Sequence, residues 1–186
     1  MATTKWELDP THSEVEFKVK HLVISTVSGS FKKFDVNVET NGDDFTTAKI
    51  RFNADVNSIS TNNEQRDGHL KSPDFFDAAN HPQLNFEGTK LEKISNDEYK
   101  LHGNLTIRET TKPVTLNVEY GGVIQDPWGN TRVGFTIDGK INRKEYGLVW
   151  HAVTETGGLV AGDDVKIHVN VEFVKQKDSV AVLQEN

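Results

Sequence analysis

The sequence predicts an all-β protein, built as one closed or nearly closed antiparallel barrel of about eight strands. Most segments alternate apolar and polar residues with a period of two, which is typical of strands that bury one face. Short polar turns join these segments, and no helical stretch is long enough for a crossover between parallel strands. The alternation recurs in eight places, at residues 15–19, 34–38, 48–56, 84–94, 99–107, 114–120, 133–141 and 167–173.

An eight-stranded barrel encloses either packed side chains or one small ligand, and alternation alone does not separate these two cases. The third segment is the clearest, because Ile50, Phe52 and Val56 oppose charged or polar neighbours. Small residues at inward positions favour a cavity; they are Ala48, Ala54, Gly103 and Gly139. Residues 21–30 and 109–113 read as connections, and Gly121-Gly122 predicts a bulge.

The longest interruption of the strand pattern, residues 62–86, predicts a short helical lid across one end of the barrel. Asn62 or Asn63 can cap a helix over residues 65–71, which Pro73 then ends. The helix carries Arg66, Asp67 and His69, and Phe75 and Phe76 follow it. These side chains predict either ligand contacts at the barrel mouth or a network that docks the helix, and the pattern does not decide between them.

A second irregular segment, residues 142–162, precedes the last strand and contains Arg143, Tyr146 and Trp150. A cation, a phenol and an indole near a pocket mouth can meet a polar head group, although packing explains them equally well.

Length and composition favour a single soluble domain over residues 1–176, followed by a disordered tail at 177–186. The chain has 21 Lys and Arg against 28 Asp and Glu, a balance that argues against binding nucleic acid or an anionic membrane. No apolar stretch is long enough to span a membrane, so stable membrane insertion is not expected. The N-terminus resembles no signal peptide, which favours a cytoplasmic protein; a periplasmic protein whose signal peptide is missing from the sequence would look the same. The sequence leaves a homodimer open.

The residues give little support for catalysis. The chain has seven histidines and no cysteine, and no His pair has metal-binding spacing. There is no nucleophile elbow and no phosphate-binding glycine loop, so we expect no metal, no cofactor and no enzymatic activity. The alternative hypotheses are an enzyme with His69 or His151 as general acid or base, and a filled barrel that serves protein–protein interaction.

Several motifs, in order along the chain, resemble those of one known family, the YceI-like proteins. They are LDPTHS (8–13), GSF (29–31), IST (59–61), RDGHLKS (66–72), DFFD (74–77), HP (81–82), GNLTI (103–107), KPV (112–114) and NRKEYG (142–147). The resemblance extends from about residue 6 to residue 175. It implies a lipocalin-like barrel with a long apolar interior.

Members of that family are associated with binding isoprenoid lipids, such as polyprenyl phosphates or quinones, and have no established catalytic activity. The resemblance therefore implies that this chain binds an elongated apolar lipid for carriage, storage or sequestration. The residues expected to contact the ligand lie in the two irregular segments and at the end of the first strand. They are His21, Arg66, His69, Phe75, Phe76, Arg143, Tyr146 and Trp150.

Overall fold

The computed structural model describes residues 3–21, 24–148 and 161–177. The described part is almost entirely β-structure, with one α-helix, α1 (Glu64–Lys71), and three 3₁₀ turns, η1 (Pro10–His12), η2 (Val56–Ser58) and η3 (Arg143–Tyr146). The strands are β1 (Thr3–Leu8), β2 (Glu14–His21), β3 (Ser25–Phe31), β4 (Phe34–Asn41), β5 (Asp44–Asp55), β6 (Ile59–Ser60), β7 (Gln83–Lys93), β8 (Glu98–Ile107), β9 (Thr110–Gln125), β10 (Thr131–Asn142) and β11 (Ala161–Lys175).

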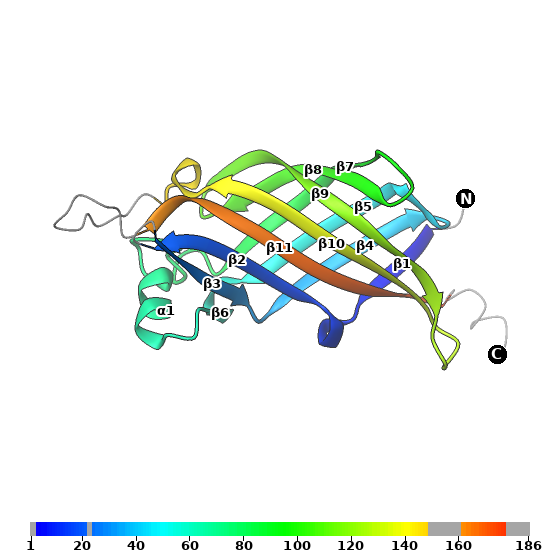
Figure 1. Cartoon of the computed structure of the whole chain (residues 1–186), viewed down its shortest axis with the longest axis horizontal. Helices are drawn as coiled ribbons and strands as arrows, with labels where there is room; N and C mark the ends of the chain where they lie inside the picture. The colour runs from blue at the N-terminus through cyan, green and yellow to red at the C-terminus, as the bar shows by residue number, and fades with distance from the viewer. Residues whose placement is uncertain (1–2, 22–23, 149–160, 178–186) are drawn as a thin grey trace.

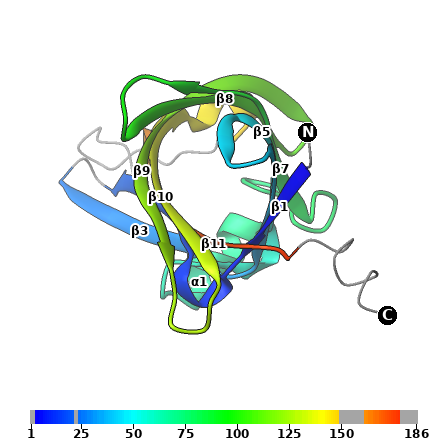
Figure 2. The ribbon, with the colours of Figure 1, turned by 90° about the vertical axis from the view of Figure 1, so that its right-hand side faces the viewer.

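The strands form a closed antiparallel barrel, as the alternation predicts (Figures 1 and 2). Eight strands make the ring, in the order β1, β4, β5, β7, β8, β9, β10 and β11, and the pairing of β11 with β1 closes it. β11 also pairs with β2, so β1 and β2 act as two halves of one strand, interrupted by η1. β3 and β6 extend the wall beyond β2, towards the end of the barrel that carries α1 (Figure 1).

The bulge predicted at Gly121-Gly122 is confirmed. Gly134 of β10 lies opposite Gly122, whereas Phe135 lies opposite Tyr120, so one residue of β9 has no counterpart. Gly122 has a φ of 100°, a conformation that suits glycine. The bulge increases the local bend where β9 and β10 continue past the body of the barrel (Figure 1).

Two predicted connections are wrong. Residues 25–31 are not a loop but strand β3, which pairs with β2 along its whole length. Most of its first five side chains are exposed, so the strand has little apolar alternation by which to recognise it. The connection expected at 109–113 is also shorter, because β9 already begins at Thr110. Pro113 is tolerated within β9 because only β8 pairs with that part of the strand; pairing with β10 starts at Asn117.

The lid helix forms where the sequence predicts it, at Glu64–Lys71, and Asn63 caps it: the Oδ1 atom accepts a hydrogen bond from the Arg66 amide at 3.0 Å. No side chain of α1 is fully buried. Viewed along the barrel from the opposite end, α1 lies at the far end, along the lower edge of the opening (Figure 2). Of the helices that the structure describes, none is long and apolar enough to cross a membrane.

Candidate ligand-binding site

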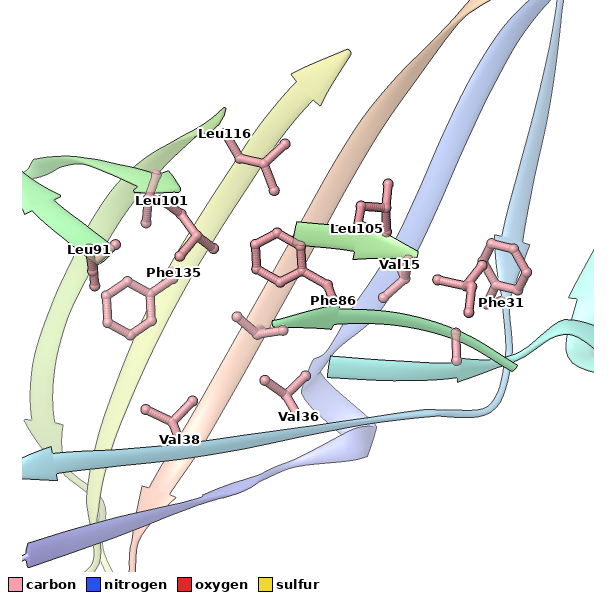
Figure 3. Packing of buried hydrophobic residues seen from close by; sticks show 14 of the residues in the cluster. Val15, Phe31, Val36, Val38, Phe86, Leu91, Leu101, Leu105, Leu116 and Phe135 are labelled. Carbon is pink, nitrogen blue, oxygen red and sulfur yellow. The ribbon is translucent and has the colours of Figure 1, made fainter. Parts of the chain in front are cut away.

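The barrel interior holds a cavity of about 390 Å³, which answers the question that strand alternation left open. Side chains on the inward faces of the strands line it, and nearly all of them are apolar. Figure 3 shows such side chains converging from opposite walls, with Phe31 and Val15 towards one end and Phe135 and Leu91 towards the other. The polar residues that border the cavity are Glu16, Lys20, Thr61, Arg66, His69 and Arg143. A cavity of this volume and lining is typical of a site for one small apolar molecule.

Two of the inward glycines occupy places where neighbouring side chains leave no room for a Cβ atom. At Gly103 that atom would overlap the Phe86 ring, and at Gly139 it would overlap the end of Leu116. These glycines therefore make room for larger side chains that themselves line the cavity.

The lid helix is attached to the barrel through Thr61. Arg66 donates from Nε to the Thr61 hydroxyl at 2.8 Å and from a terminal nitrogen to the Thr61 carbonyl at 3.0 Å. Asp67 accepts from the Thr61 amide at 2.8 Å and from its hydroxyl at 2.6 Å. Thr61 is buried and directly follows β6, so these bonds fix the start of α1 against the barrel wall. Of the two interpretations of Arg66 and Asp67, this geometry matches the docking network, although Arg66 also borders the cavity.

The chain after α1 turns back into the barrel and brings two rings with it. The amide of Phe76 donates to the Leu70 carbonyl at 3.0 Å, and the amide of Phe75 donates to the Ser72 carbonyl at 3.0 Å. Phe75 is buried, Phe76 meets Phe31 edge to face at 6.1 Å, and both phenylalanines line the cavity. Together the two rings form part of the cavity wall at the α1 end.

His69 stands at the surface side of this wall. Its Nε2 lies 2.9 Å from a carboxylate oxygen of Asp74, and its ring meets Phe75 edge to face at 5.2 Å. His69 and Arg66 line both the cavity and a shallow depression beside α1, which Asn63 and Gln65 also border. Arg66 and His69 are therefore shared by the cavity and this depression.

Arg143 is a buried cation at the same end, with only 3% of its surface exposed. Its Nε donates to the Gly162 carbonyl at 2.7 Å, and a terminal nitrogen donates to the Leu148 carbonyl at 2.6 Å. Its guanidinium carbon lies 5.9 Å from the centre of the Phe75 ring, within cation–π range. Burial lowers the pKa of Arg143, and the nearby Asp163 carboxylate opposes that effect.

Tyr146 lies close to Arg143 in sequence, but it is not among the described residues that line the cavity. It is 1% exposed and packs in the hydrophobic core, where its hydroxyl has no hydrogen-bond partner among the residues that the structure describes. Burial, with a smaller contribution from Glu145, raises its pKa to about 12. In this geometry Tyr146 is a packing residue.

Two other predicted contacts fall outside what the structure describes. Trp150 and His151, the alternative catalytic histidine, lie within residues 149–160, outside the described part. His21 ends β2, where its backbone pairs with Ser25, but its side chain is outside the described part.

Sequence reasoning missed two residues that organise this end of the barrel, Thr61 and Arg108. Arg108 lies in the tight turn between β8 and β9, with a φ of 57°. Its guanidinium donates to the Phe75 carbonyl at 3.2 Å and to the Gly147 carbonyl at 3.4 Å, so it joins the segment after α1 to the segment after η3. Thr61 ends the IST motif, but no local pattern assigns either residue this role, because their partners lie on other elements.

The spacing of Asp9, His12 and Glu172, on the outer wall beside η1, would suit a metal ion. However, the Arg132 guanidinium already lies 2.8 Å from Asp9 and 3.0 Å from Glu172. The Arg132 guanidinium therefore already supplies the cation for this cluster, which we interpret as a structural ion-pair network.

A closed antiparallel barrel with an apolar interior, bordered at its α1 end by Thr61, Arg66, His69 and Arg143, defines a lipocalin-like barrel protein. The model of the YceI-like domain matches residues 6–173, which is most of the sequence. The chain thus belongs to the YceI-like family, as the motifs indicate. It is 43% identical to a UPF0312 protein of Staphylococcus aureus and 38% identical to one of Staphylococcus epidermidis; each match covers 91% of this chain and 97% of the relative.

Solved structures agree with the fold. The YceI protein of Campylobacter jejuni superposes with a TM-score of 0.73 at 33% identity, over 86% of this chain and 90% of that one. BcnA of Burkholderia cenocepacia gives a TM-score of 0.77 at 21% identity, over 89% and 99% of the two chains. A polyisoprenoid-binding domain of Saccharophagus degradans gives 0.66 at 14% identity, over 92% and 98%. The last two likenesses concern the fold alone.

Proposed function

We propose that this protein binds one elongated apolar lipid of the isoprenoid class inside its barrel, for carriage, storage or sequestration. The observation that carries the proposal is the cavity of about 390 Å³, whose polar border residues include three from the α1 end, Thr61, Arg66 and His69, while the strand faces contribute mainly apolar side chains. A structural neighbour described as a polyisoprenoid-binding domain supports the lipid class.

The binding mechanism would be burial. Each methylene transferred from water into the cavity contributes about 0.8 kcal/mol, so a tail binds tightly without many polar contacts. Part of this gain is offset by the translational freedom that the lipid loses and by the ordering of its tail.

We infer binding rather than turnover from the state of the polar groups at the α1 end. Arg66 and Asp67 are both engaged with Thr61, and Arg143 is bonded to two backbone carbonyls. Groups committed to the protein in this way are poorly placed to exchange protons with a substrate.

The test is native mass spectrometry of the purified protein, followed by solvent extraction and identification of what is released. One isoprenoid lipid per chain supports the proposal. If the protein carries nothing and its mass stays unchanged after incubation with prenyl alcohols, prenyl phosphates and isoprenoid quinones, the proposal is wrong. A filled or collapsed barrel that serves protein interaction would then be the better hypothesis.

A further inference from the structure

We propose that six aromatic side chains close the cavity at the end opposite α1 and limit the buried part of a bound tail to about 15 to 20 carbons. This aromatic stop consists of Trp6, Phe45, Tyr99, Tyr120, Phe135 and Phe173. This inference rests on the proposed function, and it specifies how much of a bound tail contributes to binding.

The stop is one connected cluster centred on Phe45. The Phe45 ring lies 5.1 Å from Trp6 and 5.2 Å from Phe135 between ring centres, and 6.2 Å from Tyr120. Phe135 also contacts Tyr120 at 5.6 Å and Phe173 at 6.3 Å. Such distances are those of packed aromatic pairs, which add to the stability that burial alone supplies.

The cluster is fixed in place at its outer side. The Trp6 indole nitrogen donates to the Thr40 hydroxyl at 3.1 Å, and that hydroxyl donates to the Gly42 carbonyl at 2.6 Å. Trp6 is 3% exposed and Phe45 is 7% exposed. A stop that is buried and hydrogen-bonded in this way does not move aside cheaply for a longer ligand.

The rings lie in two layers relative to the cavity. Phe45, Phe135 and Phe173 line it, whereas Trp6 and Tyr120 stand behind them, outside the described lining. Phe45 comes directly after the β4–β5 hairpin, which lies at the end of the barrel away from α1 (Figure 1). The cavity therefore ends at the first layer, and the second layer supports it.

Two measures of the cavity give the same tail length. An apolar cavity of about 150 Å³ accommodates the six carbons of benzene, or about 25 Å³ per carbon, so 390 Å³ accommodates about 16 carbons. On β11 the lining runs from Val165 to Phe173, about 26 Å along the strand and about 20 Å along the barrel axis at the usual tilt. An extended chain advances about 1.25 Å per carbon, so about 16 carbons span that depth.

The consequence is a plateau in affinity. Each isoprene unit added up to three or four units is buried and should tighten binding at least about tenfold. Further units remain at the α1 end or outside the barrel and should add little.

The experiment measures displacement of a fluorescent apolar probe by prenyl alcohols of two, three, four and eight isoprene units, which share one head group. Phe45→Ala removes six ring carbons from the stop, which is room for about one more isoprene unit, and should move the plateau to longer tails. Ala48→Leu narrows the cavity from a lining position on the same strand and should move the plateau to shorter tails. It also creates no void, so it decides the matter if Phe45→Ala fails to fold.

The matched control is Phe34→Ala. Phe34 packs against Phe52 at 6.2 Å and is not among the described lining residues, so its truncation should leave the plateau where it is. If wild-type affinity still climbs from four to eight units, or if both variants fold and leave the plateau unmoved, the stop is wrong. If the wild type binds none of these alcohols, prenyl phosphates or quinones, it is the proposed function that fails.

Discussion

Gly103 and Gly139 provide a matched pair of substitutions that should separate stability from binding. Both are inward-facing glycines on barrel strands, and neither has a positive φ, so alanine suits the backbone at each. What differs is the neighbour that the new methyl group would meet.

At Gly103 an added Cβ would overlap the Phe86 ring and would lie 2.5 Å from the backbone oxygen of Glu87. That oxygen belongs to the β7–β8 ladder and cannot shift without disturbing the pairing. Overpacking of this kind costs about 1 to 3 kcal/mol. For a chain of this size each kcal/mol lowers the melting temperature by about 2 to 4 °C.

At Gly139 the overlap is with the terminal methyl of Leu116, and the other atoms of that side chain are at least 3.5 Å away. Leu116 lines the cavity and can turn into it. We therefore expect Gly139→Ala to cost less than about 1 kcal/mol, because alanine also reduces the entropy of the unfolded chain. The displaced Leu116 should take up cavity volume and weaken binding of the longest buried tail.

The assay is urea unfolding followed by circular dichroism, combined with probe displacement on each folded variant. The reasoning predicts a stability defect for Gly103→Ala and a binding defect for Gly139→Ala. Equal loss of stability in both variants, or an unaffected Gly103→Ala, would refute it.

Two further predictions concern charged groups. The pKa of Asp126 is lowered to about 2, chiefly by its hydrogen bond with the Arg132 guanidinium. The stability that this carboxylate contributes is therefore fully present above the pKa of an unfolded Asp, near 3.9, and is lost as pH falls towards 2. Urea midpoints measured across that window should therefore fall less steeply in Asp126→Asn than in the wild type; parallel curves would contradict the assignment. Arg143→Met leaves the carbonyls of Leu148 and Gly162 without their charged donor and should cost about 3 kcal/mol, whereas a loss below about 1 kcal/mol would show that these bonds are replaced.

Much of the fold could be predicted from the sequence, because barrel strands bury one face and therefore alternate. Every segment with clear alternation is a strand, and three of the inward residues of β5, Ala48, Ile50 and Phe52, line the cavity. β3 was missed for the same physical reason: its first residues are exposed, so nothing in their polarity distinguishes a strand from a loop.

The site could be predicted only in part. The helix, its Asn63 cap and the two phenylalanines are local features, and they lie where the pattern places them. Tyr146 is expected from the sequence to contact the ligand, but it is buried in the hydrophobic core and is not among the described lining residues. Arg108, which the sequence does not single out, bridges two segments that are far apart in the chain. Which residue bonds to which carbonyl depends on how the strands close into a ring, and no short stretch of sequence encodes that.

The arrangement of polar groups bears on what the protein can select. A cation that is free to meet a head group would favour phosphates over alcohols or quinones of the same tail, because charge-assisted hydrogen bonds are the strong ones. Arg66 instead donates to the Thr61 carbonyl, and Arg143 donates to the carbonyls of Leu148 and Gly162. Discrimination between head groups should therefore be weaker than discrimination between tails, since the apolar wall and the aromatic rings at its far end act on every carbon that enters.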